Sequence, residues 1–229
     1  MKFKFLPIIL ILFILISGCS NSAQEIDFKN PEDLNEPQYS IGAEVGAASE
    51  PYVGKIFPNA VEKQFNGTND MAIALEQKQI DAVVFTKPSL ESILKEKPNA
   101  FQILDKAIGE TDVHMTISPN TKIENLKNEI NEFLKAKKAD GTLDRVYKYW
   151  MVEHNEAMPD IPQTKTPDKK LVVGTMGTMP PQTFYAGNRL VGFDIEIAER
   201  FADEYGYEVE YRVEDFVSVL TDNEFGKVD

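Results

Sequence analysis

The chain has 229 residues, with 24 Lys and Arg against 37 Asp and Glu, for a formal net charge of −13 at pH 7. So acidic a chain repels phosphate backbones, and a nucleic-acid partner is therefore not expected. Hydrophobic residues make up 42% of the sequence and aromatic residues 10%, which is enough to bury a core in one large domain or two small ones.

The first nineteen residues carry the pattern of a bacterial lipoprotein signal. Lys2 and Lys4 precede an apolar run over residues 5–16, which leads into small residues and then Cys19. A basic start, a short apolar core and small residues before the processing site are typical of a cleaved secretory signal. Cys19 is the single cysteine of the sequence, so it cannot form an intrachain disulfide and is the expected lipidation site. An uncleaved membrane anchor is the alternative, which the short run disfavours.

Two polar segments are expected to connect folded parts. Residues 1–18 form the predicted signal peptide, and residues 19–38 are polar without a sustained period, as expected of a lipidated tether. Residues 151–170 contain three prolines and few large apolar side chains, which predicts a linker. Whether the N-terminus is a cleaved signal or an uncleaved anchor, the rest of the chain is expected outside the cytoplasm and tethered to a membrane.

Strand and helix signals alternate between these two segments, over residues 39–150. Residues 39–45 predict a short strand, and Gly46-Ala47-Ala48-Ser49 is a turn of small residues that leads into a helix with Ser49 as its candidate N-cap. The unsatisfied N–H groups at such a helix start could bind a carboxylate of a ligand, although turns of this kind are also common without one.

The rest of this part continues the alternation. Residues 61–65 predict a strand, 69–77 a helix and 80–85 a buried parallel strand, which together indicate βαβ organisation. An apolar stripe over residues 126–134 then predicts a helix that ends near Gly141, and a second stripe predicts a helix over residues 142–150, with Trp150 in the core.

After the linker the sequence again predicts an α/β unit. Its expected elements are a strand at 171–174, a proline-rigid turn at 179–182, a hairpin at 184–191, a helix at 194–205 and a strand at 207–213. The sequence ends in Gly226-Lys227-Val228-Asp229, where another apolar strand would be expected next. The last domain is therefore expected to be partial.

Two stretches resemble the polar amino-acid family of extracytoplasmic solute-binding proteins that serve ABC transporters. LVVGTMGTMPPQTFYAGNRLVGFDIEIAERFADEYGYEVEYRVEDF, residues 171–216, is similar to the family's opening. ALEQKQIDAVV at 74–84 and ADGTLDRVYKYW at 139–150 are similar to the family's second lobe and its closing motif. The resemblance implies an α/β fold like that of type II periplasmic-binding proteins, with a second-lobe-like domain at 39–150 followed by the start of a first-lobe-like domain at 171–229.

This order is the reverse of the family's, and two explanations stay open. One is a longer protein in which a partial module precedes a complete one. The other is a permuted module, in which the second lobe pairs with the first lobe that follows it. The linker is long enough for either arrangement at ~3.3 Å per extended residue.

The resemblance also implies where a ligand binds and how this chain departs from the usual pattern. Two hydroxyl residues usual in the first turn are replaced by alanines, and Thr86 stands where an acidic residue usually pairs with a ligand ammonium. A buried ammonium without a counter-charge is costly, so weak binding of ordinary zwitterionic amino acids is expected. The implied ligand-binding residues are Gly46, Ala47, Ala48, Ser49, Thr86, Met176, Met179, Gln182 and Phe184.

The implied function is that of a membrane-tethered, extracytoplasmic solute-binding component of an ABC importer, lipid-anchored to the bacterial cell membrane. It would capture a small polar solute, an amino acid or a related compound, by closure of two lobes, and then dock on a membrane permease. The alternatives are a sensor module of a receptor kinase or cyclase, or a dehydratase on the same fold. No nucleophile–base set is evident, so catalysis is not expected, and neither is a cofactor or a metal.

Overall fold

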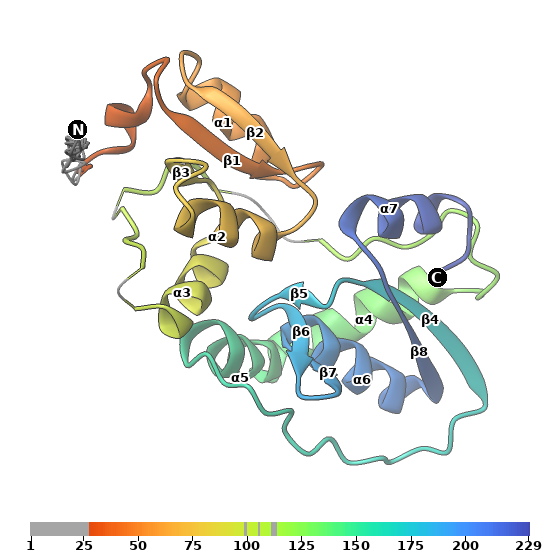
Figure 1. The fold of residues 1–229 in the computed structure, drawn as a ribbon. Coiled ribbons are helices and arrows are strands. Elements are labelled where there is room, and N and C mark those ends of the chain that lie inside the picture. The colour runs from red at the N-terminus through yellow and green to blue at the C-terminus, as the bar shows by residue number, and fades with distance from the viewer. Residues whose placement is uncertain (1–27, 99, 105, 111–113) are drawn as a thin grey trace, which may run out of the picture.

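The computed structural model describes residues 28–229 except 99, 105 and 111–113. The predicted signal and the lipidation site at Cys19 lie outside the described residues. The described chain forms two lobes, an N-terminal lobe (residues 28–110) and a C-terminal lobe (residues 114–229), as Figure 1 shows. None of the helices in the described part of the chain is long and apolar enough to cross a bilayer.

The N-terminal lobe is a small parallel sheet with helices around it. Its strands are β1 (Ser40–Glu44), β2 (Val61–Phe65) and β3 (Ala82–Val83), in the order β2-β1-β3. Its helices are η1 (Pro31–Leu34), α1 (Glu50–Ile56), α2 (Thr68–Glu76) and α3 (Lys87–Glu96). Parallel strands joined through helices are the βαβ organisation expected from the sequence, which is confirmed.

Side-chain alternation along β1 sets the two faces of this sheet. Ile41 and Ala43 are fully buried, and they pack with Val53 and Phe57 on the face that α1 covers. The intervening Gly42 faces the opposite way, where an added Cβ would lie 2.8 Å from Ile80 Cδ1. Glycine at this position therefore lets the residues around α2 pack directly on the strand.

The strand expected at 80–85 is shorter in the structure. Only Ala82–Val83 are assigned to β3, although the N–H of Asp81 donates to the carbonyl of Ser40 over 2.8 Å and the N–H of Val84 to the carbonyl of Gly42 over 3.1 Å. The Asp81 side chain also accepts hydrogen bonds from the backbone N–H of Ser40 (2.7 Å) and from its hydroxyl (3.0 Å), so it reinforces this end of the strand pair. Ile80 and Val84 are buried nevertheless, at 2% and 9% exposure, as the apolar run predicted.

The C-terminal lobe combines a two-stranded parallel sheet with an antiparallel meander. Strand β4 (Lys169–Thr175) pairs with β8 (Tyr207–Val213), and β5 (Thr178–Met179), β6 (Thr183–Ala186) and β7 (Arg189–Val191) form the meander. The helices of this lobe are α4 (Leu126–Ala139), α5 (Thr142–Tyr147), the π-helical turn η2 (Lys148–Val152), α6 (Phe193–Tyr205) and α7 (Phe216–Glu224). The hairpin expected at 184–191 and the strand expected at 207–213 are both present.

The core of the C-terminal lobe joins two segments that lie on either side of the expected linker. Phe133 of α4 packs edge-on against Phe201 of α6, with ring centroids 5.5 Å apart. The buried cluster takes members from residues 126–150 and from residues 171–207, namely Leu126, Ile130, Phe133, Val146, Trp150, Leu171, Val191, Ile197, Phe201, Ala202 and Tyr207. The packing unit therefore extends across residues 151–170, while the division of the chain into family modules stays a prediction.

Candidate functional site

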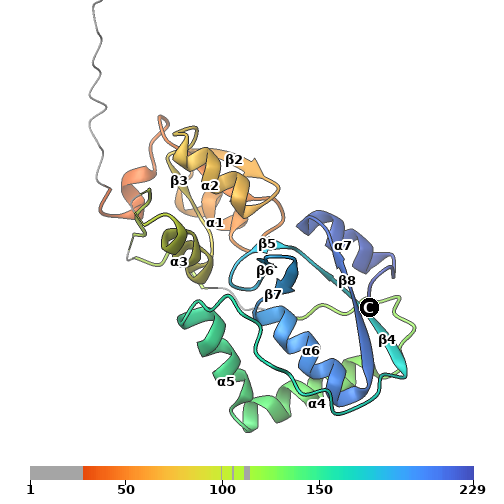
Figure 2. The same ribbon diagram turned by 60° about the horizontal axis from the view of Figure 1, so that its bottom comes forward.

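The two lobes approach each other where their parallel strands end. Both views place β5 and α7 of the C-terminal lobe on the side that faces the N-terminal lobe (Figures 1 and 2). In the N-terminal lobe β1 ends at Glu44, β2 at Phe65 and β3 at Val83. Open α/β sheets bind ligands outside the carboxyl ends of their strands, which makes this junction the candidate site.

Close approaches across the junction bring several of the expected site residues together. A Cβ built on Gly46 would lie 3.7 Å from the ring of Phe216, at the start of α7. A Cβ built on Gly67, between β2 and α2, would lie 4.0 Å from Thr178 Oγ1 on β5. The N-terminal turn is thus opposite α7, and α2 is opposite β5.

Polar side chains also meet across this junction. The Ser89 hydroxyl lies 3.1 Å from the Gln182 amide, and the Thr86 hydroxyl lies 3.4 Å from it. Ser89 is fully buried, and Gln182 is 9% exposed. The structure therefore places Thr86 and Gln182, which are 96 residues apart in the sequence, at the same contact between the lobes.

The turn expected to bind an anion already uses two of its backbone donors. Gly46, with φ 74°, donates its N–H to Glu50 Oε2 over 2.7 Å, and Ala47 donates to the carbonyl of Glu44 over 3.1 Å. Glu50 Oε1 in turn accepts from Gln64 Nε2 over 2.7 Å. A carboxylate of the chain itself thus holds the N–H of Gly46, which leaves less for the anionic end of a solute.

Ser49 stands at the expected N-cap position without capping the helix. Its side chain makes no cap hydrogen bond, and its hydroxyl oxygen is buried without a hydrogen-bond partner. A buried hydroxyl in this state costs free energy unless a ligand or another group satisfies it. Ala48 is exposed beside it.

Three buried side-chain oxygens of the described residues have no hydrogen-bond partner, and all three belong to this edge of the N-terminal sheet. They are Glu44 Oε1 at the end of β1, Ser49 Oγ in the turn and Thr68 Oγ1 at the start of α2. Glu44 and Thr68 are each only 2% exposed. Burial raises the pKa of the Glu44 carboxyl to about 7. Unsatisfied buried oxygens are uncommon in native folds, so these three make this edge of the sheet the candidate place for a polar ligand.

Glu44 and Thr68 were not among the ligand residues expected from the sequence. The available signal is the acidic residue that closes the otherwise apolar strand Ile41-Gly42-Ala43-Glu44. Alternation cannot by itself reveal that this side chain is buried, because the burial depends on the helix that follows the neighbouring strand.

The expected residues of the C-terminal lobe occupy two different settings. Met176 is buried at 6% exposure directly after β4, and Met179 is partly exposed in β5. Phe184 packs edge-on against Trp150, with ring centroids 6.1 Å apart, and thereby contributes to the core of the lobe. Of these residues, Gln182 contacts the N-terminal lobe through Ser89 and Thr86, whereas Phe184 packs in the core of the C-terminal lobe.

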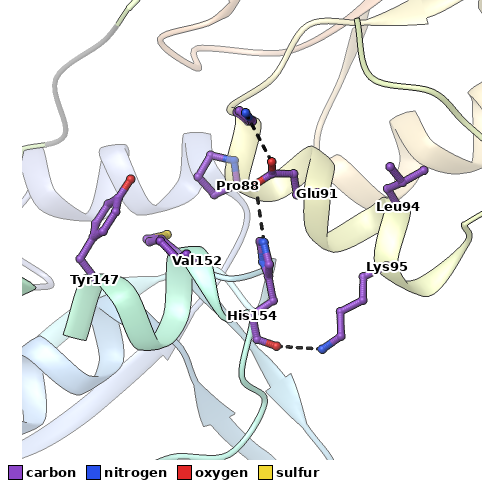
Figure 3. Close-up of a pocket in the computed structure, with 9 residues that line it drawn as sticks. Pro88, Glu91, Leu94, Lys95, Tyr147, Val152 and His154 are labelled. Carbon is purple, nitrogen blue, oxygen red and sulfur yellow. Dashed lines mark hydrogen bonds and ion pairs between the residues drawn. The ribbon is translucent and has the colours of Figure 1, made fainter. Parts of the chain in front are cut away.

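A separate pocket of about 630 Å³ lies between α3 and η2 (Figure 3). His154, which has φ 49°, places its Nδ1 3.3 Å from the Ser92 hydroxyl and its Nε2 3.6 Å from Glu91 Oε2. Lys95 donates to the carbonyl of His154 over 2.8 Å. Ser92 is 8% exposed and lies within a helix, so this serine, histidine and glutamate tie the linker to α3 and do not present an accessible nucleophile.

The described residues contain no cluster of three or more His, Cys, Asp or Glu side chains able to hold a metal ion.

The α/β fold class expected from the sequence is confirmed by the parallel sheets and their helices.

Part of the chain is similar to a known protein family. Residues 171–229 match the model of the bacterial extracellular solute-binding proteins, family 3. The arginine-binding extracellular protein ArtP of Bacillus subtilis (strain 168) is 42% identical over 53 residues, which are 23% of this chain and 21% of that protein.

Solved structures are similar over about half of their length. An ancestral arginine-binding protein bound to arginine is 28% identical with a TM-score of 0.43, and the match covers 54% of each chain. The ancestral amino acid-binding protein AncCDT-1, a precursor of cyclohexadienyl dehydratase, is 22% identical with a TM-score of 0.39, and the match covers 54% of this chain and 50% of that one. Residues 171–229, which form β4 to α7, are thus the part of this chain that is similar to the bacterial extracellular solute-binding proteins of family 3.

Proposed function

We propose that this chain is part of an extracytoplasmic solute-binding protein that captures a small polar solute between two α/β lobes for an ABC importer. The observation that carries the proposal is the family match of residues 171–229, together with the orphan polar groups at the lobe junction. The relative ArtP is named for binding arginine, which supports an amino acid or a similar compound as the solute.

Capture follows from the geometry of the junction. The carboxyl edge of the N-terminal sheet faces β5 and α7, and the Thr86, Ser89 and Gln182 side chains already touch across the gap. A solute that binds one lobe first would gain further contacts as the other lobe closes over it, which is the hinge closure typical of solute-binding proteins. The permease would then recognise the closed form.

The remaining parts of the proposal concern location. A lipid on Cys19, followed by the polar residues 20–38, would hold the lobes close to the outer surface of a bacterial cell membrane. A tethered binding protein keeps its captured solute at a high local concentration near the permease.

The proposal is tested by titrating the full chain, processed at Cys19, with a panel of amino acids and small carboxylates. Calorimetry is expected to find a dissociation constant in the micromolar range for at least one of them, and X-ray scattering is expected to record a smaller radius of gyration with that solute present. Gln182→Ala should weaken this binding, and Gln79→Ala, on the exposed turn after α2, serves as its control. A chain that binds none of the panel would contradict the proposal.

A further inference from the structure

We propose that Glu44 and Thr68 form a subsite for a cation, which takes the ammonium or guanidinium group of the captured solute. This inference rests on the proposed function and gives the chemical class of the solute. Glu44 lies outside residues 171–229, and the family match does not include it.

Glu44 and Thr68 share one face of the sheet. Ile41 and Ala43 point to the face covered by α1, where they pack with Val53 and Phe57. Because side chains alternate along a strand, Glu44 points to the other face, as Gly42 does. Thr68 begins α2, which contacts β1 and precedes Ile80, the residue that packs over Gly42.

The buried oxygens of Glu44 and Thr68 require a partner that donates hydrogen bonds. Glu44 Oε1 and Thr68 Oγ1 are buried and have no partner, and burial alone accounts for the altered proton affinity of Glu44. An ionised carboxylate in such a place is stable only when it is paired. An ammonium or guanidinium group supplies several donors and the opposite charge at once.

The surroundings oppose an anion at this place. A solute carboxylate placed beside the buried Glu44 would meet a like charge in a site that excludes water. On the elements packed around Glu44 the ionisable side chains are mostly acidic, and Lys63 donates to the carbonyl of Gln79 over 2.7 Å. These side chains are Glu50 and Lys55 on α1, Glu62 and Lys63 on β2, and Asp70 and Glu76 on α2.

Glu44 lies at the same edge of the sheet as Thr86. The strands β1 and β3 are parallel neighbours, Glu44 ends β1, and Thr86 stands between β3 and α3. A carboxylate at the end of β1 therefore lies on the side of the N-terminal lobe where Thr86 meets Gln182 of the other lobe.

The experiment uses the full chain and three probes: L-arginine, agmatine, which carries two cationic groups and no carboxylate, and succinate, which is anionic only. Calorimetry at pH 8 is expected to detect arginine and agmatine, with succinate bound at least tenfold more weakly. Glu44→Gln should weaken cation binding by roughly tenfold or more, because it removes the charge and keeps the shape. Thr68→Val should weaken it by a smaller factor.

Glu62→Gln is the matched control, since it removes one negative charge from an exposed position on the neighbouring strand. The number of protons released on binding distinguishes direct contact of Glu44 with the solute from a purely structural role of this residue. Cation binding by the wild type at pH 7 should release a fraction of a proton, measured in buffers of different ionisation enthalpy, and Glu44→Gln should release none.

Two results would overturn the inference. One is cation binding that Glu44→Gln leaves unchanged, and the other is tighter binding of succinate than of agmatine and arginine. If an uncharged or anionic solute of the wider panel binds while the cations do not, the subsite is wrong and the proposed function stands. If no solute binds at all, both fail.

Discussion

The indole Nε1 of Trp150 donates a hydrogen bond to Glu196 Oε2 over 2.6 Å, and so joins η2 to α6 inside the C-terminal lobe. Trp150 is fully buried and Glu196 is 2% exposed. The other carboxylate oxygen of Glu196 pairs with Arg200 Nη2 over 2.6 Å. The buried glutamate is thus satisfied from two sides, by residues that come from both sides of the linker.

Trp150→Phe should lower the free energy of unfolding of the C-terminal lobe by about 1–3 kcal/mol, because it leaves a buried carboxylate oxygen without its donor. Chemical denaturation followed by near-ultraviolet circular dichroism would measure the change. Tyr147→Phe, which alters an aromatic side chain 51% exposed on the preceding turn, should change it by less than about 0.5 kcal/mol. Equal effects of the two substitutions would argue against the role assigned to this hydrogen bond.

Phe133→Ala should destabilise residues 126–152 and 169–213 together, by about 3–5 kcal/mol, because Phe133 fills the core that these segments share. Hydrogen exchange with mass spectrometry is expected to show faster exchange in both segments and little change in β1. Phe225→Ala, at a position 69% exposed, is the control. Faster exchange confined to α4 and α5 would mean that the two segments do not form one cooperative unit.

Glu44→Gln should stabilise the chain in a manner that depends on pH. The pKa of Glu44 is about 7 in the folded chain against an ordinary value of 4.5, so the folded state binds its proton more tightly than the unfolded state. The stability that this proton supports is present below about pH 4.5 and is lost as the pH rises to about 7. The gain from the substitution should therefore be near zero at pH 4 and about 1–3 kcal/mol at pH 8.

Urea denaturation of wild type and variant across this pH range would measure the difference. Burial also raises the pKa of Asp194 to about 7. Asp194 is present in the wild type and in the variant, so its contribution cancels from the difference in unfolding free energy. For Glu62→Gln, the difference in unfolding free energy from the wild type should not change with pH. A constant difference from pH 4 to pH 8 would show that the Glu44 carboxyl does not titrate in this way.

His154→Ala should loosen the contact between the linker and α3, because it removes the imidazole that bridges Ser92 and Glu91. X-ray scattering of the solute-free chain is expected to show a larger radius of gyration for this variant. His114→Ala removes the exposed second histidine of the chain and should leave the radius unchanged. A His154→Ala chain as compact as the wild type would show that other contacts hold the lobes together.

Cys19→Ala should abolish lipid attachment and release the protein from the membrane fraction, since Cys19 is the single cysteine and follows the signal pattern. Metabolic labelling with a palmitate analogue would mark the wild type and a Ser22→Ala control but not the Cys19 variant. Equal labelling of all three would exclude lipidation at this residue.

Local patterns in the sequence were sufficient for the α/β class and for many of its elements. The strands at 61–65 and 207–213 and the hairpin at 184–191 follow from alternation and turn chemistry, which depend on residues close in the chain. The resemblance of residues 171–216 to solute-binding proteins rests on an ungapped run of residues, and the family match over 171–229 confirms it.

Long-range packing decided the rest. An apolar stripe such as that of α4 predicts that a helix is buried without saying against what, so only the fold could place Phe133 on Phe201 and Trp150 on Glu196. The same holds for the candidate site. Glu44 is one of many acidic residues in the sequence, and its isolation from both water and hydrogen-bond donors arises from the way the elements around β1 cover it. Burial is a property of the assembled chain, and it is burial that turns this carboxyl into a candidate ligand group.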